Sequence, residues 1–540
     1  MADEKWDSAV VYQIYWKSFK DGNDDGIGDI VGLKTKIQYI KNLGVDAVWL
    51  NPTYPSPQGD HGYDVSDYFG VEPTFGTLAE FEEMVLEIQK SGLMVLLDIV
   101  PNHVSSQHKW FKSASNAGFQ NPYESLFIIR EGTGKGGLEP PNDWKSVFGG
   151  PAWSHFPTPR LKKQRWYLHM FDPCQPDLNW QNSDVKKSFE RILRFWFNLG
   201  IDGFRIDVAH GLFKAPGLPN LDSFGDNWSA CWDQPEVHDI YRKWRLICDE
   251  YETGKFLIGE IHTSSRKRLM QYLGDDQLDA AFDFSFLHQK WSASGFRDKI
   301  LGNLTLWEET GRLPVWTLSN HDEPRHLTRY MPLLEDGTPD IESGELRYKS
   351  LLALISAMPG RIFLYNGEEL GLPQATVPIE NRQDPAFFRQ PPDSDYLGRD
   401  GCRVPLPWDH KRDYAGFSNN PPWLPMPDYW PELSVSKQEV EPKSMLNFYK
   451  KILNQRKENS WMRSTKIVDL NCQDNVLFFT KISDDLCVDA CMNFGNSEKR
   501  LPLKEIVLRT SDRHSSNYLI APGEIVFVRN NAYKIGPDNE

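Results

Sequence analysis

The sequence predicts an α/β protein built on a (β/α)8 TIM barrel, with an inserted subdomain after the third strand and an all-β domain at the C-terminus. Eight short β-rich runs end in polar residues, and amphipathic stretches with apolar residues at three- and four-residue spacing lie between them. Such alternation favours parallel βαβ units, and eight units favour a closed barrel over an open sheet. The expected strands are Val10–Trp16, Asp46–Leu50, Met94–Val100, Gly203–Asp207, Phe256–Glu260, Ala280–Phe284, Val315–Ser319 and Arg361–Gly367.

Helical patterns separate these strands, and polar residues collect where the strands end. In a barrel of this kind, catalytic residues gather at the carboxyl ends of the strands. The expected helices are Ile30–Leu43, Leu78–Lys90, Asp184–Leu199, Glu236–Tyr251, Phe296–Gly311 and Glu345–Met358. The strand ends carry Asn51, Asp98 to His103, Asp207, Glu260, Asn320 to Asp322 and Asn366 to Glu369.

Two long stretches interrupt the barrel pattern. Residues 104–174 are rich in Gly, Pro and aromatic residues and are too long for a βα loop, so we expect an inserted subdomain B that overhangs the barrel mouth. Residues 373–431 are dense in Pro, Trp and Tyr and predict a long loop after the eighth strand. The catalytic barrel is therefore assigned to 1–103 and 175–458. Alternating runs in 459–540 predict a C-terminal β-sandwich domain.

Composition narrows the class of substrate. The chain has 540 residues and a formal charge of −15, which disfavours nucleic acid and anionic membranes as partners. Aromatic residues make up 13%, a composition that suits clefts for sugars or for other flat apolar faces. The N-terminus is charged and its first apolar run is broken by Gln13, so we expect neither a signal peptide nor a spanning helix, and a cytoplasmic location. Seven Cys without a Cys-x-x-Cys pair indicate reduced thiols. Oligomeric state is left open.

The octapeptide Gly203–His210 has the strongest chemical pattern in the chain. Alternation along a strand places Arg205 and Asp207 on one face, where the guanidinium holds the carboxylate ionised and fixes its orientation. A pre-oriented carboxylate is a good nucleophile. A buried Arg–Asp ion pair with a purely structural role would have the same pattern. The octapeptide alone does not distinguish this structural pair from a catalytic carboxylate.

Four strand-end motifs together resemble the α-amylase family of glycoside hydrolases and transglycosylases, in particular its α-glucosidase and oligo-1,6-glucosidase branch. They are Asp98-Ile-Val-Pro-Asn-His103, Gly203-Phe-Arg-Ile-Asp-Val-Ala-His210, Gly259-Glu260 and Asn320-His-Asp322. Each is weak alone. Their order on strands three, four, five and seven, with Gln175-Pro-Asp-Leu-Asn179 between the first two, is specific and spans the chain.

The resemblance implies a retaining mechanism with two carboxylates. Asp207 would be the nucleophile and Glu260 the acid/base, roughly 5–5.5 Å apart, with Asp322 as a third carboxylate that holds the sugar hydroxyls. Crowding of three carboxylates is expected to raise the pKa of Glu260. His103 and His321 resemble the hydroxyl-binding histidines of the family, and Arg205 belongs to the same substrate site.

The resemblance also implies a closed pocket. In Asp60-His-Gly-Tyr-Asp64, Tyr63 would stack on the bound glucose and Asp60 would grip its far end. The segment Gly398 to Trp408 matches the place from which this branch sends an arginine to meet that aspartate, here Arg399. An enzyme closed at this end removes one glucose at a time from the non-reducing end.

A metal loop is expected after the first strand. Asp21, Asn23, Asp25 and Asp29 carry oxygen donors, and Ile27 offers a carbonyl. Hard oxygen donors at this spacing suit a structural Ca²⁺, or Mg²⁺ if several waters remain. The same loop occurs in the branch that the sequence resembles.

Linkage preference stays open at the sequence level. Val208 after the nucleophile resembles oligo-1,6-glucosidases, whereas His210 stands where related enzymes usually have Asn. The expected function is an exo-acting retaining α-glucosidase for short neutral α-glucosides such as maltose, isomaltose or sucrose. The alternatives are an α-transglucosylase or isomerase of the trehalose synthase or sucrose isomerase type, and a non-catalytic barrel. The complete carboxylate set disfavours the last of these.

Overall fold

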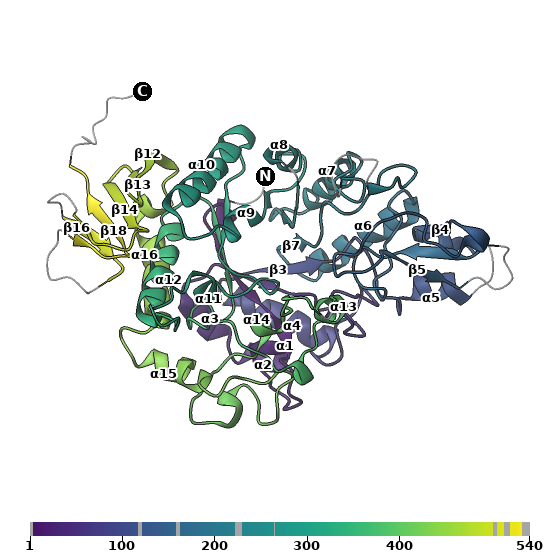
Figure 1. Cartoon of the computed structure of the whole chain (residues 1–540), viewed down its shortest axis with the longest axis horizontal. Coiled ribbons are helices and arrows are strands. Elements are labelled where there is room, and N and C mark those ends of the chain that lie inside the picture. The colour runs from purple at the N-terminus through teal and green to yellow at the C-terminus, as the bar shows by residue number, and fades with distance from the viewer. Residues whose placement is uncertain are drawn as a thin grey trace.

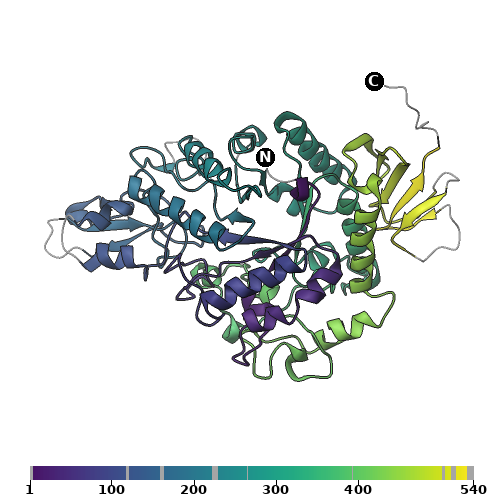
Figure 2. The ribbon, with the colours of Figure 1, turned by 180° about the vertical axis from the view of Figure 1, so that it is seen from behind.

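The computed structural model describes residues 4–116, 121–157, 163–221, 229–263, 265–391, 393–500, 505–511 and 519–531. A barrel lies at the centre of an elongated molecule, with a small β-rich extension at one end and the C-terminal sheet at the other (Figure 1; Figure 2 shows the reverse side). None of the described helices has the length and apolar character that a membrane span requires.

Eight parallel strands form the central sheet, and all eight expected strands are present. Each strand pairs with its neighbours in the order β10-β11-β1-β2-β3-β7-β8-β9. In β1, Gln13 is in register with Trp49 on one side and Tyr365 on the other. The strands are β1 Val10–Ile14, β2 Ala47–Leu50, β3 Met94–Ile99, β7 Gly203–Ile206, β8 Phe256–Gly259, β9 Ala280–Ala281, β10 Val315–Thr317 and β11 Arg361–Tyr365.

The sixth barrel strand is shorter than the sequence predicts. The run Ala280–Phe284 forms only the two residues of β9, because Asp283 accepts a hydrogen bond from the Ser285 amide and starts helix α9 (Phe284–Leu287). Likewise the single expected helix Ile30–Leu43 is divided, since Lys36 leaves helical geometry between two shorter helices.

The remaining expected helices surround the barrel and are fixed by their caps. Thr77 and Glu80 form a reciprocal capping box at the start of α4, and Asn182 caps α6. Gly311 ends α10 at φ 70°, a conformation that favours glycine. The helices between barrel strands include α2 Ile30–Lys34, α3 Ile37–Leu43, α4 Leu78–Lys90, α6 Ser183–Asn198, α7 Val237–Cys248, α8 Arg266–Met270, α10 Ala293–Thr310, α11 His326–Tyr330 and α12 Ile341–Ser356.

A three-stranded antiparallel sheet lies within the segment assigned to subdomain B. Its order is β4-β6-β5, with bounds Ile129–Glu131, Arg165–Leu168 and Trp153–Phe156. Helices α5 (Lys109–Asn116) and η2 (Pro122–Leu126) pack beside it. Isolated bridges from His103 to Asp177 and from Phe127 to Leu178 attach this extension to the end of β3.

The long segment after β11 returns across the barrel mouth. It contains short helices, among them α13 Pro385–Arg389, α14 Asp400–Arg403 and α15 Val435–Glu439, before α16 Met445–Glu458 and α17 Ser460–Arg463. Arg325 donates to the carbonyls of Asn366 and Cys402, which anchors this segment to the end of β11.

The C-terminal part is a five-stranded antiparallel sheet with a separate two-stranded ribbon. The sheet order is β12-β13-β14-β18-β16. Phe494 packs on Trp291 of the barrel at 4.4 Å between ring centroids, and both parts share one hydrophobic core. The strands are β12 Lys466–Gln473, β13 Val476–Ile482, β14 Cys487–Asn493, β16 Ile506–Arg509 and β18 Ile525–Arg529, with β15 Lys499–Arg500 and β17 Leu519–Ile520 in the ribbon.

Candidate active site

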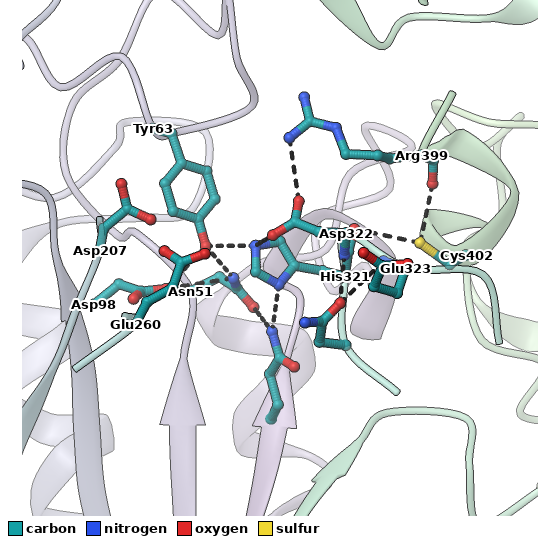
Figure 3. A network of polar contacts seen from close by, with 12 residues as sticks. Asn51, Tyr63, Asp98, Asp207, Glu260, His321, Asp322, Glu323, Arg399 and Cys402 are labelled. Atoms are coloured by element: carbon teal, nitrogen blue, oxygen red, sulfur yellow. Dashed lines mark hydrogen bonds and ion pairs between the residues drawn. The ribbon is translucent and has the colours of Figure 1, made fainter. Parts of the chain in front are cut away.

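A cavity of about 530 Å³ opens at the carboxyl ends of the barrel strands and contains the three carboxylates singled out in the sequence. Asp207, Glu260 and Asp322 line it, together with Asp60 and Arg399. Figure 3 shows Asp207, Glu260 and Asp322 near Tyr63 and His321, with Arg399 beside Asp322. The barrel thus brings together residues that lie far apart in the sequence.

Arg205 is the centre of the charged network. Its Nη1 donates to Asp98 at 3.0 Å and to Asp207 at 2.6 Å, while its Nη2 lies 2.9 Å from Glu260. Strand pairing explains the arrangement, since Asp98 in β3 is in register with Arg205 in β7. Arg205 and Asp207 therefore do not form an isolated structural ion pair, because the Arg205 guanidinium contacts three carboxylates.

These carboxylates have different proton affinities. Burial raises the pKa of Asp98 to about 7, despite the opposing charge of Arg205 and a hydrogen bond from Tyr63. Burial likewise raises the pKa of Asp207 well above its ordinary value and outweighs the charge of Arg205, so this guanidinium does not keep the pKa of Asp207 low as the sequence predicted.

The pKa of Glu260 does not follow the expectation from carboxylate crowding. Burial acts to raise it, but the charge of Arg205, the contact with His262 and the Val208 amide outweigh burial, so the pKa of Glu260 is lowered. The expected rise in the pKa of Glu260 is therefore wrong.

Tyr63 and His321 form one rigid wall of the cavity. Their rings stack at 5.3 Å between centroids, and the Tyr63 hydroxyl lies 2.6 Å from His321 Nε2 and 3.0 Å from Asp98. Gln13 donates its amide N–H to His321 Nδ1 at 2.8 Å, which leaves the proton of the neutral ring on Nε2. Burial lowers the pKa of His321 to about 3, so the ring is neutral at physiological pH.

His103 lies on the same side of the cavity as Asp60. Its Nε2 is 3.2 Å from the carbonyl oxygen of Tyr63 and 3.2 Å from the amide of Gln175, which also donates to Asp60 at 3.0 Å. Burial lowers the pKa of His103 to about 4.

An arginine clamp closes one end of the cavity. Arg399 Nη2 lies 2.7 Å from Asp60 and 2.7 Å from Asp384, and its Nη1 lies 3.1 Å from Asp322. Arg403 adds a second contact to Asp322 at 2.8 Å. The long segment after β11 therefore supplies Asp384, Arg399 and Arg403 to a site whose other members come from strand ends.

Val208 lines the cavity and has an unusual backbone conformation. Its φ is 43°, a left-handed conformation that is strained for a β-branched residue. In this geometry the Val208 amide donates to Glu260 Oε2 at 3.0 Å. His210 and Trp232 lie beyond it, with rings 5.3 Å apart, and both line the cavity.

Several residues of the site had no assigned role in the sequence. Asp98 and Asn51 were visible as polar strand ends, and Asn51 donates to the Tyr63 hydroxyl at 2.7 Å. Asp384 follows no strand, so no periodicity or spacing could have found it, whereas Arg403 lies within the segment Gly398 to Trp408, in which only Arg399 was given a role. His262, 3.7 Å from Glu260 Oε1, follows the motif Gly259-Glu260 by two residues.

The loop expected to hold Ca²⁺ or Mg²⁺ has suitable donors, but they bind the loop itself in the structure. Asp21 accepts the amides of Asn23, Asp24 and Gly26, and Asp29 accepts those of Gly22, Asn23 and Gly32. The described residues contain no group of three or more His, Cys, Asp or Glu placed to share a cation. The metal, with Asn23, Asp25 and Ile27 as further ligands, stays a prediction.

The chain belongs to the α-amylase family, because residues 13–465 match the model of the alpha amylase catalytic domain. It is thus an enzyme of the glycoside hydrolase class. It is 32% identical to an oligo-1,6-glucosidase of Parageobacillus thermoglucosidasius over 96% of each chain, and 32% identical to an alpha-glucosidase of Apis mellifera over 92% of this chain and 86% of that one.

Solved structures show the same similarity. The alpha-glucosyl transfer enzyme XgtA superposes with a TM-score of 0.86 at 33% identity, covering 97% of this chain and 99% of that one. The trehalulose synthase MutB from Pseudomonas mesoacidophila MX-45 superposes with a TM-score of 0.87 at 28% identity, covering 98% of this chain and all of the other.

Proposed function

We propose that this enzyme is an exo-acting, retaining α-glucosidase that releases glucose from the non-reducing end of short α-glucosides. The observation that carries the proposal is the clamp of Arg399 on Asp60 and Asp384 at one end of a cavity whose carboxylates lie beside it. A substrate would place one sugar ring against the clamp, with its glycosidic bond at Asp207 and Glu260. A chain could not extend past the clamp.

The chemistry needs an ionised nucleophile and a protonated acid. Asp207 would attack the anomeric carbon as Glu260 donates a proton to the leaving oxygen, which breaks the glycosidic bond and forms a glucosyl ester on Asp207. Water would then attack the anomeric carbon while Glu260 accepts its proton, which breaks the bond between that carbon and the Asp207 carboxylate. This second step restores both carboxyl groups.

The pKa shifts of the two carboxyl groups have opposite directions, since the pKa of Asp207 is raised and that of Glu260 is lowered. The mechanism needs the reverse order, with Glu260 protonated and Asp207 ionised. We infer that substrate favours this order by displacing water from the cavity and burying Glu260 further.

Product analysis tests this proposal. With maltotriose labelled at its reducing end, exo action from the non-reducing end gives labelled maltose and unlabelled glucose as the first products. Proton NMR at early times should show α-glucose before mutarotation, as retention requires. Labelled glucose as the first product, or β-glucose, would overturn the assignment.

A second candidate is transfer in place of hydrolysis, and the similarity to an alpha-glucosyl transfer enzyme and a trehalulose synthase favours it. In that reaction a sugar hydroxyl would replace water in the second step. Incubation with sucrose separates the two functions, since hydrolysis gives equimolar glucose and fructose whereas isomerisation gives a new disaccharide and little free glucose.

A further inference from the structure

A second cavity, of about 250 Å³, lies at the opposite end of the barrel from the catalytic site. Its lining includes Val10 and Met94, which are the first residues of β1 and β3, and Asp46 directly before β2. Because the barrel strands are parallel, these positions mark the amino ends of the strands. This cavity is therefore separate from the catalytic carboxylates and from the Arg399 clamp.

The lining of this cavity is strongly basic. It contains Lys5, Arg456, Lys457 and Arg463, and its one acidic residue is Asp46. Asp46 is already engaged, since its carboxylate accepts the Val10 amide at 2.9 Å and lies 2.8 Å from Lys457. A concentrated positive charge is unusual on a molecule with a formal charge of −15.

Arg456 adds a buried cation that forms no ion pair with a carboxylate in the described part of the chain. The residue is 1% exposed, and its two terminal nitrogens donate to the carbonyl oxygens of Ser356, Met358, Met462 and Gly360. Its Nε has no hydrogen-bond partner among the described residues. Burial, together with the nearby charge of Arg463, lowers the pKa of Arg456 to about 10. A buried charge of this kind is stabilised by an anion.

We propose that this cavity binds a phosphate group, either inorganic phosphate or the phosphate of a small monoester. Guanidinium and ammonium groups form charge-assisted hydrogen bonds with phosphate oxygens, and Arg463 has no ion-pair partner in the described part of the chain that would compete. A volume of 250 Å³ admits a phosphate together with the body of a small monoester.

Bound phosphate would join parts of the chain that are distant in sequence. Arg456 and Lys457 lie at the end of α16 and Arg463 ends α17, whereas Lys5 precedes the first barrel strand. An anion that contacts them would hold the N-terminal segment and both helices against the base of the barrel. Because only the folded chain assembles this set, the ligand would raise the melting temperature.

Isothermal titration of the full-length enzyme with inorganic phosphate tests the proposal, with chloride and sulfate at matched ionic strength as comparisons. We expect saturable phosphate binding and a melting temperature that rises with phosphate. Arg463→Gln and Lys5→Gln should each weaken binding about tenfold, as expected for the loss of one charged hydrogen bond. The control Arg130→Gln removes an exposed arginine of β4, outside this cavity, and should leave affinity unchanged.

The outcomes separate the sources of the ligand. Tighter binding of glycerol phosphate than of inorganic phosphate would identify a phosphate monoester as the ligand, and equal affinity would identify phosphate itself. Absence of saturation up to about ten millimolar, or equal affinity in the Arg463 variant and the wild type, would overturn the proposal. In that case the basic side chains only stabilise the carboxyl-terminal end of α16 through the helix dipole.

Discussion

Glu260 and Asp207 share one guanidinium, and their separate roles can be tested by removing each carboxylate. We expect Asp207→Ala and Glu260→Gln each to abolish turnover of maltose while the melting temperature stays within a few degrees, because each variant loses one half of a two-carboxylate mechanism. Fluoride needs little acid help to leave, so Glu260→Gln should still react with α-glucosyl fluoride. Mass spectrometry should find a glucosyl adduct on Asp207, and a label on another carboxylate would contradict the assignment.

Val208 is suited to a test of linkage preference because Thr has almost the same shape. Both residues are β-branched, so Val208→Thr keeps the strain at φ 43° and adds only a hydroxyl toward the leaving sugar. One new hydrogen bond to an α-1,4 acceptor would shift the ratio of maltose to isomaltose hydrolysis by about 1 kcal/mol, several-fold in specificity constants. An unchanged or lower ratio would mean that linkage is set elsewhere, with His210 as the next residue to change.

His210 contributes to the pH dependence of stability. Burial, with the charge of His262, lowers the pKa of His210 to about 3, against about 6.5 in the unfolded chain. Below pH 6.5, His210 is therefore protonated in the unfolded state but not in the folded state. The free energy of unfolding falls as pH falls from 6.5 toward 3.

His210→Asn should reduce this loss. At pH 5 the wild type should lose about 2 kcal/mol more of its unfolding free energy, relative to pH 7, than the variant does. Urea unfolding at the two pH values measures the difference. Parallel losses in the two proteins would show that His210 does not remain neutral in the fold.

At the scale of elements, the loop between α1 (Trp16–Phe19) and α2 decides whether a metal stabilises the fold. Asp21 and Asp29 already hold the loop amides, so a bound Ca²⁺ or Mg²⁺ would add to an ordered loop. We expect a chelator to lower the melting temperature while activity at room temperature changes little. At one hundred times its dissociation constant, the metal would add about 2.7 kcal/mol of stability.

The variant Asp25→Asn tests the metal loop directly. Asp25 is a predicted ligand, it is exposed, and its carboxylate accepts hydrogen bonds from Asn23 and Ile27 of the loop. This variant should show a smaller response to the chelator than the wild type. If verified metal-free enzyme melts at the same temperature as the untreated enzyme, the loop is held by its amides alone.

At the scale of the whole molecule, the C-terminal sheet and the barrel share one core. Phe494 is buried between Trp291 and Phe296, with centroids at 4.4 and 5.3 Å. We expect Phe494→Ala to lower stability by about 3 kcal/mol and to leave a single calorimetric transition, because the two parts unfold together. Phe478→Ala, at a position 37% exposed on the same sheet, is the matched control and should cost far less. Two separate transitions in the wild type would show that the parts unfold independently.

The sequence by itself determined the barrel and the residues at its strand ends. Strand periodicity is local, and a strand that ends in Asp207 or Glu260 must present it at the barrel mouth, because parallel strands share one carboxyl edge. Helix caps such as Thr77 with Glu80 are equally local. These features could be predicted because the physical cause of each lies within a few residues of chain.

Only the tertiary structure decided how protons and charges are shared. The lowered pKa of Glu260 depends on Arg205 and the Val208 amide, which approach it from a neighbouring strand. Asp384 and Arg403 reach the site from a segment without periodicity, and the basic cavity combines residues from both ends of the sequence. Electrostatic effects depend on distances through space, and those distances are fixed only when the whole chain has packed.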